Sequence, residues 1–291
     1  IFGNGYYSNS GKAILFVVNM STGAISKIDT GIGSNNGLST PRLVIGSDAT
    51  IKQVYAGDLR GNLWKFDFNA SGNLQVAYSG QPLFKAVRSS VEQPITVQPE
   101  IVSHPNGGAM VVFGTGKIFE DTDAANMNVQ SMFGVWDNYN VSGVTPTAIT
   151  SGRSALVQQT LTLNGTQFYQ VSKNTINWTT KRGWYIDLDL AGSAGERVTI
   201  DPLIFYDQAV FTTIIPGTTT DPCSSDGKST FLQLNYLTGG PLAYQTIDRN
   251  NDGVVDGGDL LGGMLFVSGK QGALTFGTTI LEKGKKGYVY H

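Results

Sequence analysis

Short alternations of apolar and polar residues recur along the chain, and this period of two predicts β-strands. Residues 53–57 and 63–68 flank the turn-forming stretch 58–62, a spacing typical of a hairpin. No segment of ten or more residues has a convincing helical period, so we expect a nearly all-β protein. Further segments with strand character are 13–19, 110–114, 132–136, 184–188, 210–213, 231–234 and 264–267.

Some of these strands are similar to one another together with the turn that follows them. Residues 15–23 (LFVVNMSTG) and 231–239 (FLQLNYLTG) share apolar residues, an Asn, two further residues and Thr-Gly. Residues 63–72 (LWKFDFNASG) form a third copy, with Asp67 in place of the Asn. Repeats of roughly 40–50 residues that end in such a turn predict a β-propeller, here of about five to seven blades. The uneven spacing predicts long inserted loops, for which 149–172 and 217–229 are the candidates.

Composition fits this architecture. The 291 residues are enough for one large domain, and we treat 1–291 as a single propeller. Charged residues make up 14%, below the ~25% of typical soluble proteins, and 37 glycines favour short strands and tight turns. A net charge of −2 gives no general attraction to nucleic acid or anionic membranes. The basic residues Lys283, Lys285 and Lys286 are expected to form a solvated loop.

Cysteine usage and the chain start point to an exported fragment. The only cysteine, Cys223, excludes zinc fingers, iron–sulfur clusters and disulfides within this chain. No signal peptide is visible, and no apolar run approaches the ~20 residues that span a bilayer. Because Ile1 stands within a strand-turn pattern, we expect a fragment of a longer protein whose targeting signal lies outside it. Cys223 could find a partner there.

The clearest chemical signal is the stretch 248–259, which reads DRNNDGVVDGGD. Side chains bearing oxygen occupy positions 1, 3, 5, 9 and 12, and Gly253 stands at position 6, as in the calcium loop of an EF-hand. Calcium prefers six to eight oxygens at ~2.3–2.6 Å, and Gly allows the sharp turn that brings them together. The expected Ca²⁺ ligands are Asp248, Asn250, Asp252, the backbone carbonyl of Val254, Asp256 and Asp259.

An ordinary acidic turn without an ion is the alternative, since Asn, Asp and Gly are also common turn residues. Four carboxylates within twelve residues repel one another, and a bound cation offsets that repulsion. Asp259 replaces the usual Glu at position 12, so it is either a shorter ligand or a cap for the next segment. No amphipathic helices flank the loop, which predicts the loop without the EF-hand fold.

Catalytic constellations are sparse. His104 precedes Pro105 in an expected exposed turn, and the other histidine, His291, is the last residue. Asp187 and Asp189 share one strand face, where a glycosidase pair is conceivable but solvated charge is more common. Cys223 has no basic neighbour to activate its thiol. The four tryptophans are expected to pack between blades, with a sugar-binding platform as the minority interpretation: Trp64, Trp136, Trp178 and Trp184.

Four short motifs stand out along the chain: FGNGY at 2–6, VYAGDLRGNLWKFD at 54–67, FGTGK at 113–117 and FGVWDN at 133–138. Together they resemble the PilC/PilY family of type IV pilus biogenesis factors and tip-associated adhesins, whose signature YAGDxxGNLWRFD is similar to residues 54–67. The calcium-type loop also falls where the family carries one. Each motif is short, but together they span nearly the whole chain.

This resemblance implies a modified C-terminal β-propeller with quinoprotein-like blades and a calcium loop coupled to pilus extension and retraction. It implies twitching motility, adhesion to surfaces or host cells, and a place at the pilus tip or outer membrane. Pilus machinery with minor pilins, and a host receptor, are the implied partners. The ligands carried over are Asp248, Asn250, Asp252, Val254 and Asp256, whereas Asp259 is not secured. An Arg-Gly-Asp motif is absent from the sequence, so an integrin role gains no support.

Two alternatives remain. The blades also resemble those of quinoprotein dehydrogenases, an enzyme interpretation that requires cationic and polar residues to converge on the central channel. The self-contained calcium loop and the single cysteine favour a protein that is not an enzyme. The second alternative is an adhesin or lectin-like module in which calcium is purely structural.

Overall fold

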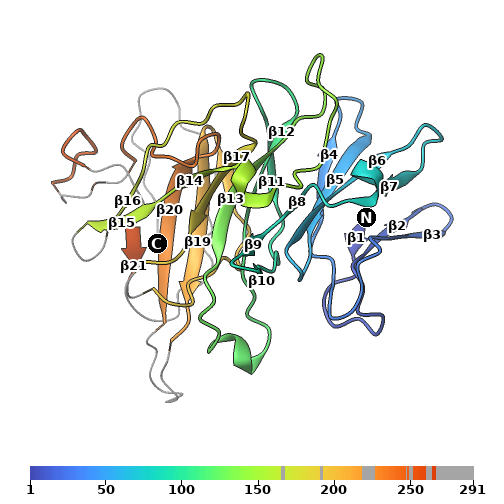
Figure 1. Ribbon diagram of the computed structural model, residues 1–291, viewed down its shortest axis with the longest axis horizontal. Helices are drawn as coiled ribbons and strands as arrows, with labels where there is room; N and C mark the ends of the chain where they lie inside the picture. Colours follow the sequence, from blue (N-terminus) through green and yellow to red (C-terminus); the bar gives the residue numbers. More distant parts are fainter. Residues whose placement is uncertain are drawn as a thin grey trace.

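The computed structural model describes residues 1–164, 168–190, 193–217, 227–246, 248, 252–259 and 264–266. Strands dominate this part of the chain, as the alternating pattern predicts (Figure 1). None of the helices in the described part is long and apolar enough to cross a membrane. The helical elements are α1 (Ala77–Gly80), η1 (Asp121–Asp123) and η2 (Gly152–Ala155).

Residues 2–85 form two antiparallel sheets. The first has the order β1-β2-β3, and the second has the order β4-β5-β6-β7, with β8 also paired to β6. The predicted hairpin around residues 58–62 is confirmed as β5 and β6. The strands are β1 (Phe2–Gly3), β2 (Ile14–Val18), β3 (Ile25–Asp29), β4 (Arg42–Ile45), β5 (Ile51–Gly57), β6 (Asn62–Phe68), β7 (Leu74–Val76) and β8 (Phe84–Lys85).

Two larger sheets follow. A small hairpin, β9 (Val87–Arg88) with β10 (Val91–Glu92), precedes the third sheet. The third sheet, in the order β11-β12-β13-β17-β14, contains β11 (Glu100–Ser103), β12 (Ala109–Gly114), β13 (Ser131–Asp137), β14 (Val157–Gln159) and β17 (Gly183–Asp187). The fourth, in the order β15-β16-β21-β20-β19-β18, contains β15 (Leu161–Asn164), β16 (Phe168–Val171), β18 (Leu203–Phe205), β19 (Gln208–Ile215), β20 (Lys228–Asn235) and β21 (Met264–Phe266).

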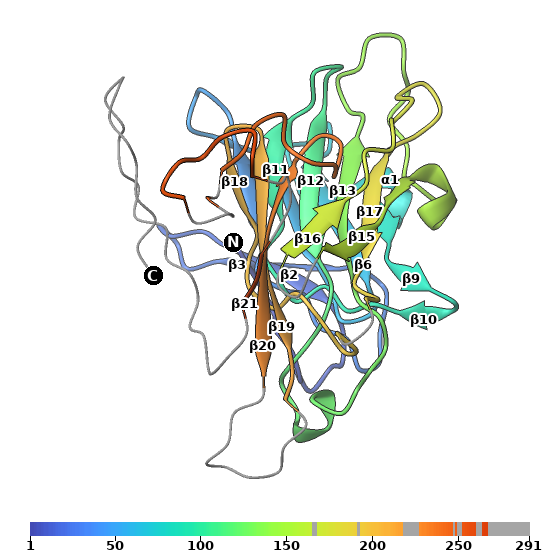
Figure 2. The ribbon, with the colours of Figure 1, turned by 90° about the vertical axis from the view of Figure 1, so that its left-hand side faces the viewer.

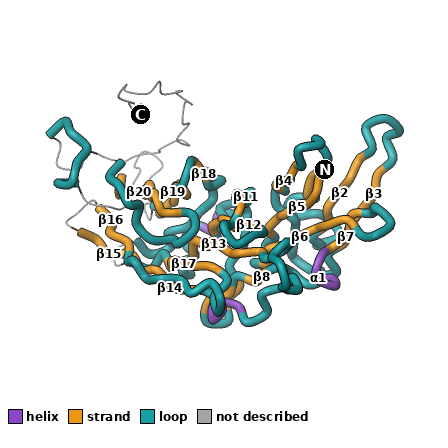
Figure 3. The backbone as a smooth tube through the Cα atoms, turned by 90° about the horizontal axis from the view of Figure 1, so that it is seen from above, coloured by secondary structure: helices purple, strands orange, loops and turns teal. Residues whose placement is uncertain are grey.

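The sheets stand side by side in chain order and form an open arc (Figures 1 and 3). Viewed from one end, β19 and β20 stand in front and the N-terminal sheets lie behind (Figure 2). The described residues give four sheets of three or more strands, fewer than the five to seven blades expected, and these sheets do not close into a ring. The expectation of an inserted loop at 149–172 is wrong, because this segment contains β14, which joins the third sheet, and β15 and β16, which join the fourth. Most of the other expected loop, 217–229, lies outside the described residues.

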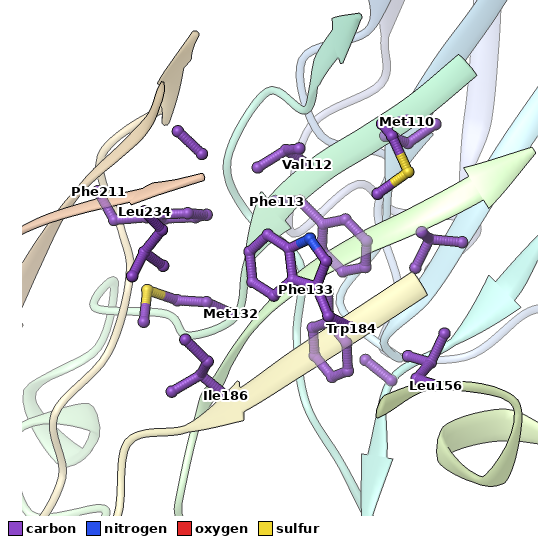
Figure 4. Close-up of a cluster of buried hydrophobic side chains, with 14 of the residues drawn as sticks. Met110, Val112, Phe113, Met132, Phe133, Leu156, Trp184, Ile186, Phe211 and Leu234 are labelled. Atoms are coloured by element: carbon purple, nitrogen blue, oxygen red, sulfur yellow. The ribbon is translucent and has the colours of Figure 1, made fainter. Parts of the chain in front are cut away.

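Apolar side chains fill the spaces between neighbouring sheets. In the larger cluster Phe113 stacks on Phe133 with ring centroids 5.2 Å apart, and Trp184 packs among them without solvent exposure (Figure 4). A second cluster with Leu15 and Trp64 joins the first two sheets. Large buried aromatics contribute much of the apolar area that stabilises such a fold. The packing role predicted for the tryptophans is confirmed for Trp64, Trp136 and Trp184, which are buried, and for the partly buried Trp178.

The repeated turn has a common hydrogen-bond pattern. Asn19 and Asn235 each accept two backbone N–H groups of the following residues through the side-chain oxygen. Each backbone carbonyl of these Asn residues also accepts the N–H of the Gly four residues later, at 2.8 Å. In the third copy the capping residue is Asn69, not Asp67, because that turn is one residue shorter and Asn69 accepts the N–H groups of Ser71 and Asn73.

The signature around Asp58 is explained by its buried carboxylate. Its two oxygens accept five hydrogen bonds: from the Asn36 and Asn62 amides, the backbone N–H groups of Arg60 and Asn62, and Trp64 Nε1. A carboxylate bound by that many donors holds a turn in one conformation. Gly61 adopts φ +76°, and a Cβ there would lie 2.6 Å from the Ala86 carbonyl oxygen. The motif therefore fixes the β5–β6 hairpin.

Candidate calcium-binding loop

The loop 248–259 connects β20 to β21, and its turn forms at the predicted glycine. Gly253 adopts φ +86°, a conformation that residues with a Cβ rarely take. Its backbone N–H donates to Asp248 Oδ2 at 2.8 Å, which links positions 1 and 6 of the motif. The chain reverses here, as an EF-hand-type loop requires.

Two further carboxylates cap the backbone of the loop. Asp252 Oδ1 accepts the N–H of Val254 at 2.8 Å, and Asp256 Oδ1 accepts the N–H of Gly258 at 2.7 Å. Local contacts of this kind are typical of Asp residues in turns. Residues 252–258 are exposed, so the loop lies on the surface.

Asp259 differs from the other acidic residues because it is only 2% exposed. Its Oδ2 accepts the N–H of Asp256 at 3.0 Å, and its own N–H donates to the Asp256 carbonyl at 3.1 Å. These contacts are those of a cap, one of the two roles that the sequence leaves open. Participation of Asp259 as a calcium ligand remains a prediction.

The donor set suits calcium, since carboxylate, amide and carbonyl oxygens are the ligands that this hard cation prefers. Asn250 lies outside the described residues. Within the described part of the chain, no group of three or more His, Cys, Asp or Glu side chains is close enough to hold a metal ion. The described segment thus has the turn and the oxygens of a calcium loop, while its carboxylates cap backbone N–H groups.

His104 is buried, contrary to the expected exposed turn. Its ring stacks on Trp136 with centroids 4.3 Å apart and meets Trp178 edge-on at 4.5 Å. Nδ1 accepts the N–H of Asn106 at 3.0 Å, which places the proton of the neutral ring on Nε2. Burial lowers the pKa of His104 from 6.5 to about 4. Two flanking tryptophans explain the burial, and the sequence gives no direct sign of this contact.

Asp187 and Asp189 form ion pairs, and the expectation of a solvated pair is wrong for Asp187, which is 8% exposed. Arg88 bridges the two residues, with Nε 3.1 Å from Asp187 and Nη2 2.9 Å from Asp189. Arg153 Nη1 lies 2.7 Å from the other Asp187 oxygen, which also accepts the Ser131 hydroxyl. These contacts join the β9–β10 hairpin to the third sheet and leave Asp187 in a structural role.

A buried ion pair between the second and third sheets was not foreseen from the sequence. Lys65 Nζ lies 2.9 Å from Asp137 Oδ2, and both side chains are at most 3% exposed. Tyr55 and Tyr78 donate their hydroxyls to the same carboxylate, and burial beside that charge raises the pKa of both phenols. The Lys65 ammonium also lies 4.3 Å from the Tyr139 ring centroid, a cation–π distance. Removing one partner of such a pair is costly.

Polar residues also meet where the first strands of successive sheets lie together. Arg42 pairs with Glu100 and donates to Gln98 Oε1 at 3.3 Å, while the Gln98 N–H donates to Asp201 at 2.8 Å. Burial, with a smaller contribution from Asp201, raises the pKa of Glu100. These contacts link β4 of the second sheet to β11 of the third and to the segment that precedes β18 of the fourth. Several predicted residues lie outside the described part, namely Cys223, Lys283, Lys285, Lys286 and His291.

Comparison with known proteins gives one consistent result. The family model for the PilY1 β-propeller domain matches residues 1–174, a region that ends before the calcium-type loop. The type IV pilus biogenesis factor PilY1 of Pseudomonas aeruginosa is 35% identical over 300 residues, covering 88% of this chain and 25% of that protein. A PilY1 homologue of Xylella fastidiosa is 32% identical over 274 residues, covering 84% of this chain and 18% of its own length.

A solved structure agrees with these relatives. The crystal structure of the Pseudomonas aeruginosa PilY1 C-terminal domain superposes with a TM-score of 0.79 at 33% identity, covering 96% of this chain and 65% of that one. The chain therefore spans about a quarter or less of the curated relatives and about two thirds of the solved domain.

Proposed function

This chain belongs to the PilY1 β-propeller family, and from that premise we propose that it is the calcium-responsive propeller of a type IV pilus biogenesis factor. In this role it modulates pilus extension and retraction, and through them twitching motility and adhesion to surfaces or host cells. The observation that carries the calcium part is the loop 248–259, with six oxygen donors at EF-hand spacing and Gly253 in the left-handed conformation.

The loop residues would act by exchanging local contacts for an ion. Asp248, Asp252 and Asp256 accept loop N–H groups, and an ionised carboxylate can accept about four contacts, so it can bind a cation and an N–H group together. Calcium, when bound, supplies positive charge that offsets the repulsion among these groups. Binding would stabilise the folded loop by about 2.7 kcal/mol when calcium is a hundredfold above Kd.

The position of the loop between two strands supports a link between calcium binding and the fourth sheet. It follows β20 and precedes β21, which are paired neighbours in the fourth sheet. Asp259 is buried at its end and holds the backbone of Asp256. A cation that fixes the exposed part of the loop would therefore also fix the approach to β21, and a partner that contacts this surface would sense calcium.

We propose a role without catalysis. The relatives are named as pilus biogenesis factors, and the candidate catalytic residues of this chain have structural partners. His104 is enclosed by two tryptophans, and Asp187 is paired with two arginines. We place the protein at the bacterial surface, at the pilus tip or outer membrane, with pilus machinery such as minor pilins as partners.

The test compares two neighbouring substitutions in a piliated bacterium that carries the full-length protein. Asp252→Ala removes motif position 5, whereas Asn251→Ala changes position 4, which the motif does not use. We expect Asp252→Ala to abolish the calcium dependence of twitching and Asn251→Ala to preserve it. Attachment to host cells is measured separately to test the adhesin alternative. If Asp252→Ala lost attachment but kept normal, calcium-dependent twitching, calcium would be structural in an adhesin, and the proposed control of the pilus would be rejected.

A further inference from the structure

A second oxygen-rich cluster lies within the fourth sheet. Thr213 of β19 and Thr230 of β20 are cross-strand partners, and both side chains are fully buried. β19 and β20 run side by side here (Figure 2). The segment that leads to β18 covers this pair and places Glu196 over it, with Arg197 forming a β-bridge to Ile214. Glu196 is 1% exposed.

The hydrogen bonds of this cluster do not account for all its oxygens. Thr213 donates its hydroxyl to Glu196 Oε1. Glu196 Oε2 and Thr230 Oγ1 make no hydrogen bond of good geometry in the described part of the chain, although the Thr230 hydroxyl lies close to both the Glu196 carboxyl group and the Tyr169 hydroxyl. Buried polar atoms without partners are rare and costly. An atom bound between the two oxygens would satisfy both.

Further oxygens lie near the carboxyl group, and no Lys or Arg of the described residues forms an ion pair with it. The Ser193 side chain lies near Glu196, and Tyr169 of β16 is buried close enough for the Glu196 charge to contribute to its raised pKa of about 12. Arg197 directs its guanidinium elsewhere, to the carbonyl oxygens of Lys117, Asp123 and Asn126. None of the ion pairs within the described ranges includes Glu196.

We propose that Glu196, Thr213, Thr230 and Ser193 form a binding site for a monovalent cation, sodium or potassium. The donors are all oxygen, which selects hard cations. A single carboxylate balances one positive charge, whereas a divalent ion would leave an excess charge in a region of low dielectric constant. A bound cation supplies the charge that Glu196 lacks and a partner for both unsatisfied oxygens. This site is independent of the calcium loop and stands whether or not that loop binds calcium.

Thermal unfolding with a calcium chelator present tests the site. The protein is measured in sodium, potassium and tetramethylammonium chloride at one fixed ionic strength, because the last cation is too large for a buried site. We expect sodium or potassium to raise the Tm by about 2–4 °C over tetramethylammonium, as expected for ~1 kcal/mol of binding in a domain of this size. Glu196→Gln should remove this difference, and Asp121→Asn, which neutralises an exposed acid, should keep it.

A second pair of variants covers the case in which Glu196→Gln does not fold. Thr230→Val removes the unsatisfied hydroxyl and should reduce or abolish the cation difference, whereas Thr230→Ser keeps the hydroxyl and should retain it. Equal Tm values in the three salts for the wild-type protein would overturn the proposal. An equal effect of sodium or potassium on the Tm of wild type, Glu196→Gln and Thr230→Val would also overturn it. A water molecule or a protonated carboxyl group would then be the partner of the unsatisfied oxygens.

Discussion

At the scale of single residues, buried acidic side chains determine where neighbouring segments meet. Asp58 holds the β5–β6 turn, Asp137 joins the second and third sheets, and Asp187 joins the β9–β10 hairpin to the third sheet. Each is surrounded by donors, which offset the cost of removing a carboxylate from water.

Loss of the Asp58 carboxylate should be among the most damaging single changes. Asp58→Ala leaves five donors without their acceptor, so we expect the free energy of unfolding to fall by about 3 kcal/mol or more. Urea unfolding measures this loss. Asp121→Ala, at an exposed position, serves as the control and should change stability by less than about 0.5 kcal/mol. If both variants unfolded at a similar urea concentration, the hydrogen bonds of the Asp58 carboxylate would not be important for stability.

The burial of His104 predicts a pH-dependent stability. Its pKa is about 4 in the folded protein and 6.5 when unperturbed, so the unfolded chain binds more protons between these values. Stability should therefore fall as the pH drops through this window, by on the order of 2–3 kcal/mol from this residue. The contribution of His104 is the difference in the free energy of unfolding between wild type and His104→Phe, measured by urea unfolding at pH 7, 5.5 and 4.5. Parallel pH profiles for the two proteins would show that His104 does not titrate as the structure indicates.

At the scale of elements, one turn recurs in two places with different surroundings. The Asn-capped turns at 19–23 and 235–239 have the same hydrogen bonds, and their last residues, Gly23 and Gly239, have φ +70° and +65°. A Cβ on Gly23 would meet nothing within 4 Å, whereas a Cβ on Gly239 would lie 2.3 Å from the Trp184 ring. The glycine is needed for the turn in both copies and for packing in only one.

This pair provides a matched experiment. Gly23→Ala should cost about 1 kcal/mol, the strain of a left-handed Ala. Gly239→Ala carries the same strain and also displaces the Trp184 indole, so it should cost at least about 2 kcal/mol more. Thermal or urea unfolding of the two variants gives the difference. Equal destabilisation would mean that the indole moves aside freely and that this packing is not tight.

At the scale of the whole molecule, the sequence predicts local structure better than long-range contacts. The strands follow from alternation, and the turns follow from Asn, Asp and Gly at fixed offsets, as Gly253 shows. The burial of His104 depends on Trp136 and Trp178, and the charge of Lys65 is balanced by Asp137 from another sheet. Such pairings join residues far apart in the chain, and a single sequence carries no signal for them. The segment 149–172 was misjudged for the same reason, because its strands add to the edges of existing sheets.

A calorimetric calcium titration of the metal-stripped protein, beside Asp252→Ala and Asn251→Ala, tests whether the propeller responds to calcium. We expect one saturable site in the wild-type protein and in Asn251→Ala, with Kd between about 10⁻⁶ and 10⁻³ M. Asp252→Ala should lose this site and stay folded. If the wild-type protein gave no heat and no calcium-dependent shift in Tm, the loop 248–259 would be an ordinary acidic turn and the propeller would not respond to calcium through it.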